Sequence, residues 1–276
     1  MIVLKNLHFS YSHGPKVLKE VSLHFEPGNI YGLFGKNGEG KTSLMKIMSG
    51  LRYVKQGVYS LDNHFISARK ADWLQHIFLV PEDFELPNIQ IAQYQSINAP
   101  FYPNFSKSQF YELIAEFGLT PKAKIGTLSF GQRKKVLIAF ALSTNTKFLL
   151  MDEPTNGLDI PSKSQFRKVM ASVATEDKCI IISTHQVRDL YSLLNHVVVL
   201  DQAQVIFDYS LAKVADKLWF GKPHAEHKEM ALYAEPGFSG KSILQKNDLE
   251  ETEVDLELLF QGVLSAPTQI NTALQP

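Results

Sequence analysis

Residues 35–42 read Gly-Lys-Asn-Gly-Glu-Gly-Lys-Thr, and this stretch decides which fold the chain adopts. It follows the pattern G-x-x-x-x-G-K-[ST], in which the N–H groups of a glycine-rich loop surround phosphate oxygens. Residues 30–34 before it form an apolar run typical of a buried strand, and residues 41–50 after it are typical of a helix. Strand, loop and helix in this order predict a phosphate-binding loop in an α/β protein.

The residue types in this loop suit a nucleotide. Glycine has no Cβ, so the backbone can curl closely, and the positive end of the following helix dipole attracts phosphate. Lys41 can reach β- and γ-phosphates, and the Thr42 hydroxyl can ligate Mg²⁺. We expect the nucleotide to be bound by Gly35, Lys36, Asn37, Gly38, Glu39, Gly40, Lys41, Thr42 and Ser43.

The composition is that of an ordinary globular protein, with 45% hydrophobic and 20% charged residues in a chain of 276. Lysine and arginine number 28 and so do the acids, so a neutral chain gives no electrostatic indication of a nucleic acid as partner. Cys179 is the only cysteine, which excludes an internal disulfide, and its apolar neighbours predict a buried thiol. We expect no secretory signal, and the apolar runs fall short of the roughly 18 residues that cross a bilayer.

Apolar strand patterns and helical patterns alternate along most of the chain. We expect strands at 2–9, 17–25, 30–34, 58–61, 76–80, 147–151, 179–183 and 197–200, and helices at 41–50, 108–117, 129–142, 162–174 and 187–194. Buried strands alternating with helices predict a parallel sheet that is covered on both faces. The pattern is helical over residues 88–145, and we expect this insert to lie outside the sheet.

The pattern changes after residue 209, which suggests two domains, 1–209 and 210–276. In the second part we expect helices at 211–218 and 254–263 and short strands at 231–233 and 242–245. The acidic run at 248–257 is typical of a solvated face. We therefore interpret residues 210–276 as a small C-terminal accessory domain or tail.

A second motif, Phe-Leu-Leu-Met-Asp-Glu at residues 148–153, joins four apolar residues to two acids. It is typical of a buried strand that ends in carboxylates, at the edge where doubly wound sheets bind ligands. Asp152 is placed to hold Mg²⁺, and Glu153 is placed to polarise the water that attacks a γ-phosphate. A strand followed by an ordinary acidic turn is the alternative, but the phosphate loop in the same chain favours a catalytic site.

A third motif, Leu-Ser-Phe-Gly-Gln at residues 128–132, opens a predicted helix, where the Ser129 hydroxyl and the Gly131 N–H can form a second anion site. The three motifs in this order resemble the nucleotide-binding subunit of ABC transporters, over residues 1–209. The resemblance implies a P-loop NTPase (ABC ATPase) core with an antiparallel β subdomain, a helical signature subdomain and a small C-terminal accessory region.

The resemblance also implies roles for single residues. Asp159, in the D-loop-like segment 154–159, would communicate across a dimer, and His185 at a strand end would touch the γ-phosphate. Tyr11 lies where the family places an aromatic that stacks on adenine; packing in the core beside Phe9 is the alternative. The implied catalytic residues are Glu153, His185 and Lys41. The implied ATP-binding residues outside the phosphate loop are Tyr11, Ser129, Gly131, Gln132 and Asp159.

Two positions depart from the family pattern. Residues 81–83 read Pro-Glu-Asp where the family commonly has a glutamine that touches Mg²⁺ and links the site to the membrane partner. Glu82 can still ligand the metal with Thr42 and Asp152, although its charge lies near the γ-phosphate. Phe130 replaces the first glycine of the signature, but Gly131 remains, so we expect ATP binding to be retained.

The family mechanism implies that two subunits pack head to tail, so that Lys41 of one and Ser129 of the other clasp one ATP. Hydrolysis then lets the dimer open. The expected cofactors are ATP and Mg²⁺. The expected partners are a second ATPase subunit, identical or paralogous, and a multi-span membrane permease, with no nucleic acid. We expect a peripheral location on the cytoplasmic face of the membrane.

Other functions remain open on the sequence alone. Residues 101–105 and the tail at 254–260 look like those of bacterial ABC-2-type exporter ATPases, which implies export. A soluble ABC ATPase that is not coupled to a transporter is the main alternative. A degenerate binding module is a third, but intact Lys41, Asp152, Glu153 and His185 favour hydrolysis.

Overall fold

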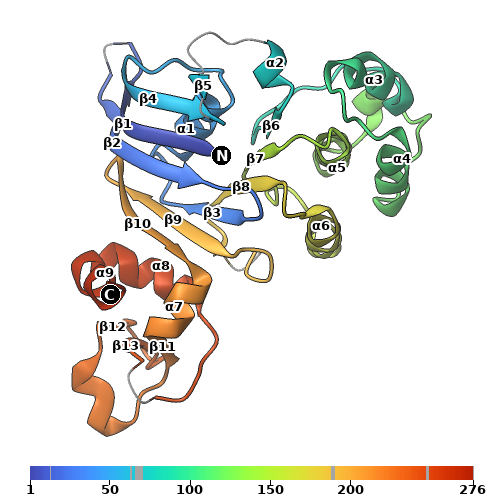
Figure 1. The fold of residues 1–276 in the computed structure, drawn as a ribbon. Coiled ribbons are helices and arrows are strands. Elements are labelled where there is room, and N and C mark those ends of the chain that lie inside the picture. The colour runs from blue at the N-terminus through green and yellow to red at the C-terminus, as the bar shows by residue number, and fades with distance from the viewer. Residues whose placement is uncertain (13, 63, 66–70, 188–189, 247–248, 276) are drawn as a thin grey trace.

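A computed structural model describes residues 1–275 apart from residues 13, 63, 66–70, 188–189 and 247–248. Its centre is a six-stranded sheet with the order β10-β9-β3-β8-β7-β6 (Figure 1). The strands are β3 (Ile30–Phe34), β6 (Ile77–Val80), β7 (Phe148–Asp152), β8 (Cys179–Thr184), β9 (His196–Asp201) and β10 (Gln204–Ser210). Neighbouring strands are parallel except β9 and β10, so the predicted parallel sheet is confirmed apart from the antiparallel edge strand β10.

The register of the sheet brings three strand ends together. Every residue of β3, β7 and β8 is buried, as the apolar runs that make up most of these strands predict. Phe34 pairs with Thr184, and Asp152 pairs with Ser183. The chain leaves these strands at one edge of the sheet, so the phosphate loop, Glu153 and the segment after Thr184 begin side by side.

A second, antiparallel sheet with the order β2-β1-β4-β5 lies beside the central one (Figure 1). Its strands are β1 (Ile2–Ser10), β2 (Lys16–Phe25), β4 (Gln56–Leu61) and β5 (His64–Phe65). The helix α1 (Lys41–Met48) buries Leu44, Met45, Ile47 and Met48 in a hydrophobic cluster that includes residues of both sheets. This sheet confirms the expected antiparallel subdomain. The short helix α2 (Ala71–Leu74) precedes β6.

The predicted helical insert lies beyond β6, at one end of the molecule (Figure 1). It contains α3 (Ile91–Asn98), the 3-10 turns Ala99–Phe101 and Ile125–Thr127, α4 (Lys107–Glu116) and α5 (Phe130–Ser143). The ring of Phe140 holds these helices together, with centroids 5.2 Å from Tyr94, 5.0 Å from Phe105 and 6.2 Å from Phe110. Helix α6 (Ile160–Val173) follows β7.

The last part of the chain forms a small three-stranded sheet with helices. It contains α7 (Leu211–Lys217), β11 (Leu218–Gly221), the 3-10 segment Ala225–Met230, β12 (Tyr233–Ala234), β13 (Ser242–Gln245), α8 (Leu256–Ser265) and α9 (Pro267–Ala273). The strand order is β11-β13-β12. Phe260 of α8 packs edge-on against Phe34 at a centroid distance of 5.9 Å, so this part shares a core with the central sheet.

The prediction of a helix at 187–194 is wrong in its described part. The N–H of Leu190 donates to Val187 O, and that of Leu193 donates to Leu190 O, so residues 190–193 form successive turns. Buried Leu190, Leu193 and Leu194 suit either conformation, which is why their spacing misled the prediction. Residues 188–189 of this range lie outside the described residues. The prediction also missed β10, β11 and α9.

Candidate active site

A cavity of about 410 Å³ opens where the ends of β3, β7 and β8 meet. It is lined by Tyr11, Val17, Asn37, Gly38, Gly40, Lys41, Thr42, Ser43, Glu82, Asp152, Glu153 and His185. These residues come from five separate stretches of the sequence, and all but Val17 were predicted for the site. The structure therefore assembles most of the predicted nucleotide and metal ligands around one space.

The phosphate loop needs glycine at two of its turns. Gly38 and Gly40 have φ angles of 89° and 95°, which side chains other than glycine rarely adopt. A Cβ on Gly40 would lie 2.8 Å from the carbonyl oxygen of Val17. Three predicted members of the loop, Gly35, Lys36 and Glu39, do not line the cavity.

Those three residues make hydrogen bonds that stabilise the loop without lining the cavity. Lys41 is buried, and its Nζ donates to Gly35 O at 2.6 Å and to Lys36 O at 3.0 Å. The Glu39 carboxylate accepts the N–H of Ala203, which ties the loop to the turn between β9 and β10. Burial lowers the pKa of Lys41, while the carboxylates of Glu153, Asp152, Glu82 and Glu39 oppose this shift.

Oxygen ligands suited to a divalent cation meet beside Lys41. The Thr42 hydroxyl donates to Asp152 Oδ2 at 2.7 Å, and the Ser183 hydroxyl donates to Asp152 Oδ1. Glu82 adds a second carboxylate to the lining of the same cavity. A hydroxyl and two carboxylates are hard oxygen donors of the kind that Mg²⁺ prefers, so these residues fit the expected metal.

Glu153 and His185 form a pair at the wall of the cavity. Glu153 Oε1 accepts the His185 main-chain N–H at 3.0 Å and lies 2.7 Å from His185 Nδ1. Glu153 Oε2 is buried and has no hydrogen-bond partner among the described residues. The φ angle of Glu153 is 45°, a left-handed conformation in which a carboxylate residue is strained. A strained, partly unpaired carboxylate at a strand end is typical of a catalytic group.

Tyr11 stands at the mouth of the cavity, with its hydroxyl 3.0 Å from Ser43 Oγ. Its ring is 41% exposed and meets Phe9 edge-on, so it is only partly in the core and leaves surface available for stacking. The Arg52 guanidinium lies 5.5 Å from the ring centroid. Glu82 is held by the amide of Asn156, which donates to Oε1 at 2.9 Å.

The signature residues lie apart from the cavity. Ser129 caps α5: its hydroxyl accepts the Gln132 N–H, and the Gln132 side chain accepts the Ser129 N–H, which together form a capping box. Ser129 is exposed, and neither it nor Gly131 or Gln132 is among the described residues that line the cavity. Asp159 is likewise exposed and caps α6, where its bonds to Ser162 lower its pKa.

One buried residue near the site escaped the prediction. The side chain of Lys134 on α5 is completely buried, and its Nζ donates to Glu153 O at 2.7 Å and to Asn156 O at 3.1 Å. Burial lowers the pKa of Lys134, opposed chiefly by the Glu82 carboxylate. Lys134 shares a helix face with the apolar residues Leu137 and Ile138. This spacing is visible in the sequence and could have indicated that the lysine is buried.

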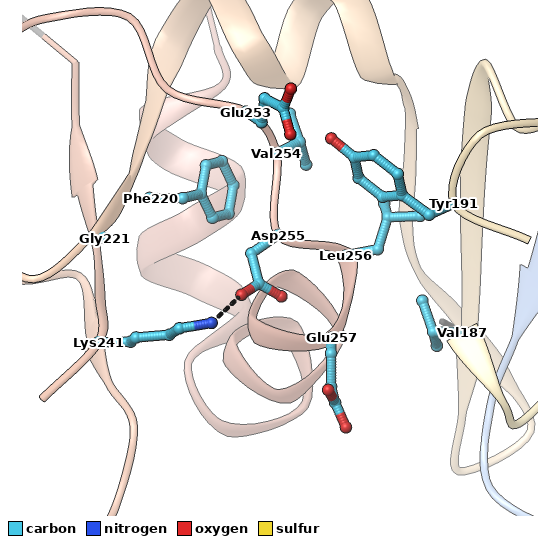
Figure 2. A pocket seen from close by; sticks show the side chains of 10 residues that line it. All are labelled: Val187, Tyr191, Phe220, Gly221, Lys241, Glu253, Val254, Asp255, Leu256 and Glu257. Carbon is cyan, nitrogen blue, oxygen red and sulfur yellow. Dashed lines mark hydrogen bonds and ion pairs between the residues drawn. The ribbon is translucent and has the colours of Figure 1, made fainter. Parts of the chain in front are cut away.

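A second cavity, of about 470 Å³, lies between the turns after His185 and the C-terminal part (Figure 2). Its walls include Val187, Tyr191 and Phe220, with the acids Glu253, Asp255 and Glu257 facing it. Lys241 Nζ lies 2.7 Å from Asp255 Oδ2. None of the predicted site residues lines this cavity.

Comparison with known families identifies the architecture that carries this site. Residues 18–156, which include the phosphate loop, the signature segment and the strand β7, match the family model described as ABC transporter. The chain belongs to the ABC transporter family. As an ABC ATPase it binds and hydrolyses ATP, which confirms the interpretation of the three motifs. Among the described residues, no helix combines the length and apolar character needed to cross a membrane.

Curated relatives carry names that agree with this assignment. The ABC transporter ATP-binding protein NatA of Bacillus subtilis is 31% identical over 199 residues, which cover 70% of this chain and 81% of NatA. The glutamate/aspartate import ATP-binding protein GltL of Escherichia coli is 29% identical over 220 residues, 75% of this chain and 90% of GltL. A putative ABC transporter ATP-binding protein of Treponema denticola is 27% identical over 213 residues, and the match spans only 43% of that protein.

Solved structures share the fold. An ATP-binding subunit of an ABC transporter superimposes with a TM-score of 0.71 at 22% identity and covers 78% of this chain and 91% of its own. A dimeric ATP-binding cassette bound to ADP and Pi in a post-hydrolysis state gives 0.68 at 24% identity, covering 76% and 99%. The central sheet, the antiparallel sheet and the helical insert are therefore those of an ABC ATPase.

Proposed function

We propose that this chain is the ATPase subunit of a transporter and works as a head-to-tail dimer with ATP between the subunits. The observation that carries the dimer is the position of Ser129. It is exposed and lies outside the lining of the cavity that contains Lys41 and Glu153. A signature that contacts phosphate must then do so in the cavity of another subunit.

The surface around the signature supports this arrangement. Phe130 is 41% exposed and Ile160 is 83% exposed, and each follows a helix cap that the family mechanism places at the dimer interface, Ser129 and Asp159. A second subunit packed against these two helix caps would remove both apolar side chains from water. The partner in the dimer is a second copy or a paralogue.

Within each site the residues have distinct roles in the proposal. Lys41 binds β- and γ-phosphates, Tyr11 stacks on the adenine, and the loop N–H groups hold phosphate oxygens. Thr42, Asp152 and Glu82 would hold Mg²⁺, which would neutralise charge on the phosphates. Glu153 accepts the proton of the attacking water through Oε2, while its Oε1 is fixed by His185.

The transport partner is a separate multi-span permease, and the chain acts peripherally on the cytoplasmic face of the membrane. The helical insert is the part that we infer to contact this permease, because Ile97 of α3 and Phe101 of the 3-10 turn after it are exposed apolar residues. We infer export from the resemblance of residues 101–105 and 254–260 to exporter ATPases. We treat residues 210–276 as an accessory domain attached to the ATPase domain 1–209.

The dimer is tested with a variant that binds ATP but does not hydrolyse it. Glu153→Gln in the full chain should run as a dimer with MgATP and as a monomer with MgADP, measured by light scattering during size-exclusion chromatography. Adding Ser129→Arg should abolish the dimer by placing a bulky side chain at the signature. Ser96→Arg, at an exposed serine on α3, is the matched control and should leave the dimer intact. A dimer that survives Ser129→Arg contradicts the proposal.

A further inference from the structure

Lys134 is an ammonium group buried inside the protein, one turn after the signature cap of α5. Its side chain has no exposed surface. Burying a charged amine is unfavourable unless the group is hydrogen-bonded and surrounded by opposite charge. The contacts that offset the cost of burying the Lys134 ammonium therefore show which part of the protein it stabilises.

Those contacts converge on the peptide that carries the catalytic carboxylate. Nζ donates to the carbonyl oxygen of Glu153 at 2.7 Å and to that of Asn156 at 3.1 Å. The Asn156 N–H also donates to the Glu153 carbonyl at 3.2 Å, so the turn from 153 to 156 closes around the ammonium. Glu153 adopts its left-handed φ of 45° at this turn, a conformation that persists only when its surroundings hold it.

Side chains from the start of α5 and from the segment after β6 complete the surroundings of Lys134. Lys134 Nζ lies 5.7 Å from the centroid of the Phe130 ring. Phe84 packs on Phe130 at a centroid distance of 5.4 Å. Glu82, two residues before Phe84, accepts the side-chain amide of Asn156. The two residues that depart from the family pattern, Glu82 and Phe130, thus both belong to the packing around Lys134.

We propose that Lys134 is a positioning residue for Glu153: its two hydrogen bonds hold the left-handed turn that aims the carboxylate at the attacking water. The inference rests on the catalytic role assigned to Glu153 in the proposed function. Because Lys134 sits on the helix that Ser129 begins, it also connects the signature segment of a subunit to the catalytic strand of the same subunit. It does not line the nucleotide cavity, so we expect it to act on the reaction through the turn from 153 to 156, chiefly through Glu153.

The test compares Lys134→Met with Lys135→Met in the full chain. Methionine keeps the length and apolar stem of lysine but removes the donors, and Lys135 is the neighbouring lysine, which reaches Gln165 on α6 instead. Lys134→Met should lower kcat for ATP hydrolysis at least about tenfold and leave KM and the calorimetric Kd for ATP within about threefold. Lys135→Met should match the wild type. A wild-type kcat for Lys134→Met overturns the inference.

A double variant separates positioning from general damage. Groups that act through one residue are not additive, so Lys134→Met should cause no further loss in a Glu153→Gln background, measured in single turnovers. An undiminished loss in that background overturns the inference. A Glu153→Gln single variant with wild-type turnover would instead defeat the catalytic assignment itself, which keeps the two failures distinct.

A second variant covers the case in which Lys134→Met does not fold, judged by circular dichroism and ATP binding. Lys134→Gln retains one neutral donor group at the buried position. It should fold, bind ATP normally and show a lower kcat than the wild type, with the same lack of additivity in Glu153→Gln. Wild-type turnover in this variant counts against the inference as firmly as it does for methionine.

Discussion

His185 holds one oxygen of Glu153 from two sides, with its main-chain N–H at 3.0 Å and its ring Nδ1 at 2.7 Å from Oε1. The second oxygen, Oε2, is left to act on another group, and the described residues offer it no hydrogen-bond partner. The pair thus divides the carboxylate into an anchored half and a half that can accept a proton. This relationship leads to the first two predictions.

Glu153→Gln should bind MgATP with nearly unchanged affinity and hydrolyse it about 10²–10⁴-fold more slowly, because an amide cannot accept the proton of water. Calorimetry measures the binding, and phosphate release measures the rate. The matched control is Glu250→Gln, at an exposed acid of the C-terminal part. Normal hydrolysis by Glu153→Gln would show that another group is the base.

His185→Ala should lower kcat about 10²-fold, since it removes the ring that fixes Glu153 and the proposed contact to the γ-phosphate. Affinity for ADP, which has no γ-phosphate, should not change. His24→Ala, at an exposed histidine on β2, provides the comparison for losing an imidazole elsewhere. Equal effects of the two substitutions would remove His185 from the site.

Lys41→Ala should weaken ATP binding by about 10–100-fold, the loss expected for charge-assisted hydrogen bonds to phosphate. The same helix offers a control in Lys46, whose substitution by alanine should not affect calorimetric binding. Unchanged affinity in Lys41→Ala would overturn the phosphate-loop assignment, whatever happened to turnover.

Glu82→Gln tests the carboxylate that replaces the usual glutamine. If Glu82 ligates the metal, the Mg²⁺ concentration for half-maximal hydrolysis should rise about tenfold, because a charged oxygen ligand is replaced by a neutral one. Asp83→Asn changes the neighbouring, exposed acid and should leave the magnesium titration where it is. An identical titration for Glu82→Gln would take Glu82 out of the metal site.

Cys179 gives a prediction about stability. Burial raises the pKa of its thiol from the ordinary value of 9.0 to about 12. Above pH 9 the thiol ionises in the unfolded state but stays neutral in the folded state. The free energy of unfolding therefore falls by about 1.4 kcal/mol per pH unit until the folded thiol also ionises near pH 12. The free energy of unfolding measured with urea should therefore fall more steeply between pH 9 and 11 in the wild type than in Cys179→Ala. Parallel curves would contradict the shift.

The sequence predicted those parts of the molecule whose form is set locally. The phosphate loop requires glycine at 38 and 40, α5 begins next to Ser129 as expected, and β7 is an apolar run that ends in Asp152. Each of these patterns has one stable structural solution. The edge at which they meet followed from the rule that parallel strands end together.

Features set by distant contacts were not predictable in the same way. The turns at 190–193 bury the same leucines as a helix would, so spacing alone does not separate the two. Glu153 has a left-handed φ, and its carbonyl oxygen accepts a hydrogen bond from Lys134, which lies 19 residues earlier in the sequence. Lysine at a helix surface is the ordinary expectation, and only the folded turn from 153 to 156 makes its burial favourable.

The contact between Phe34 and Phe260 has a practical consequence. Phe34 is the last residue before the phosphate loop, and the ring that rests against it comes from α8, near the end of the chain. Removing the C-terminal part of the chain would remove Phe260 and expose the ring of Phe34 to water. A trimmed version ending near residue 210 should thus aggregate or melt early, and poor nucleotide turnover by such a fragment would say nothing about the enzyme.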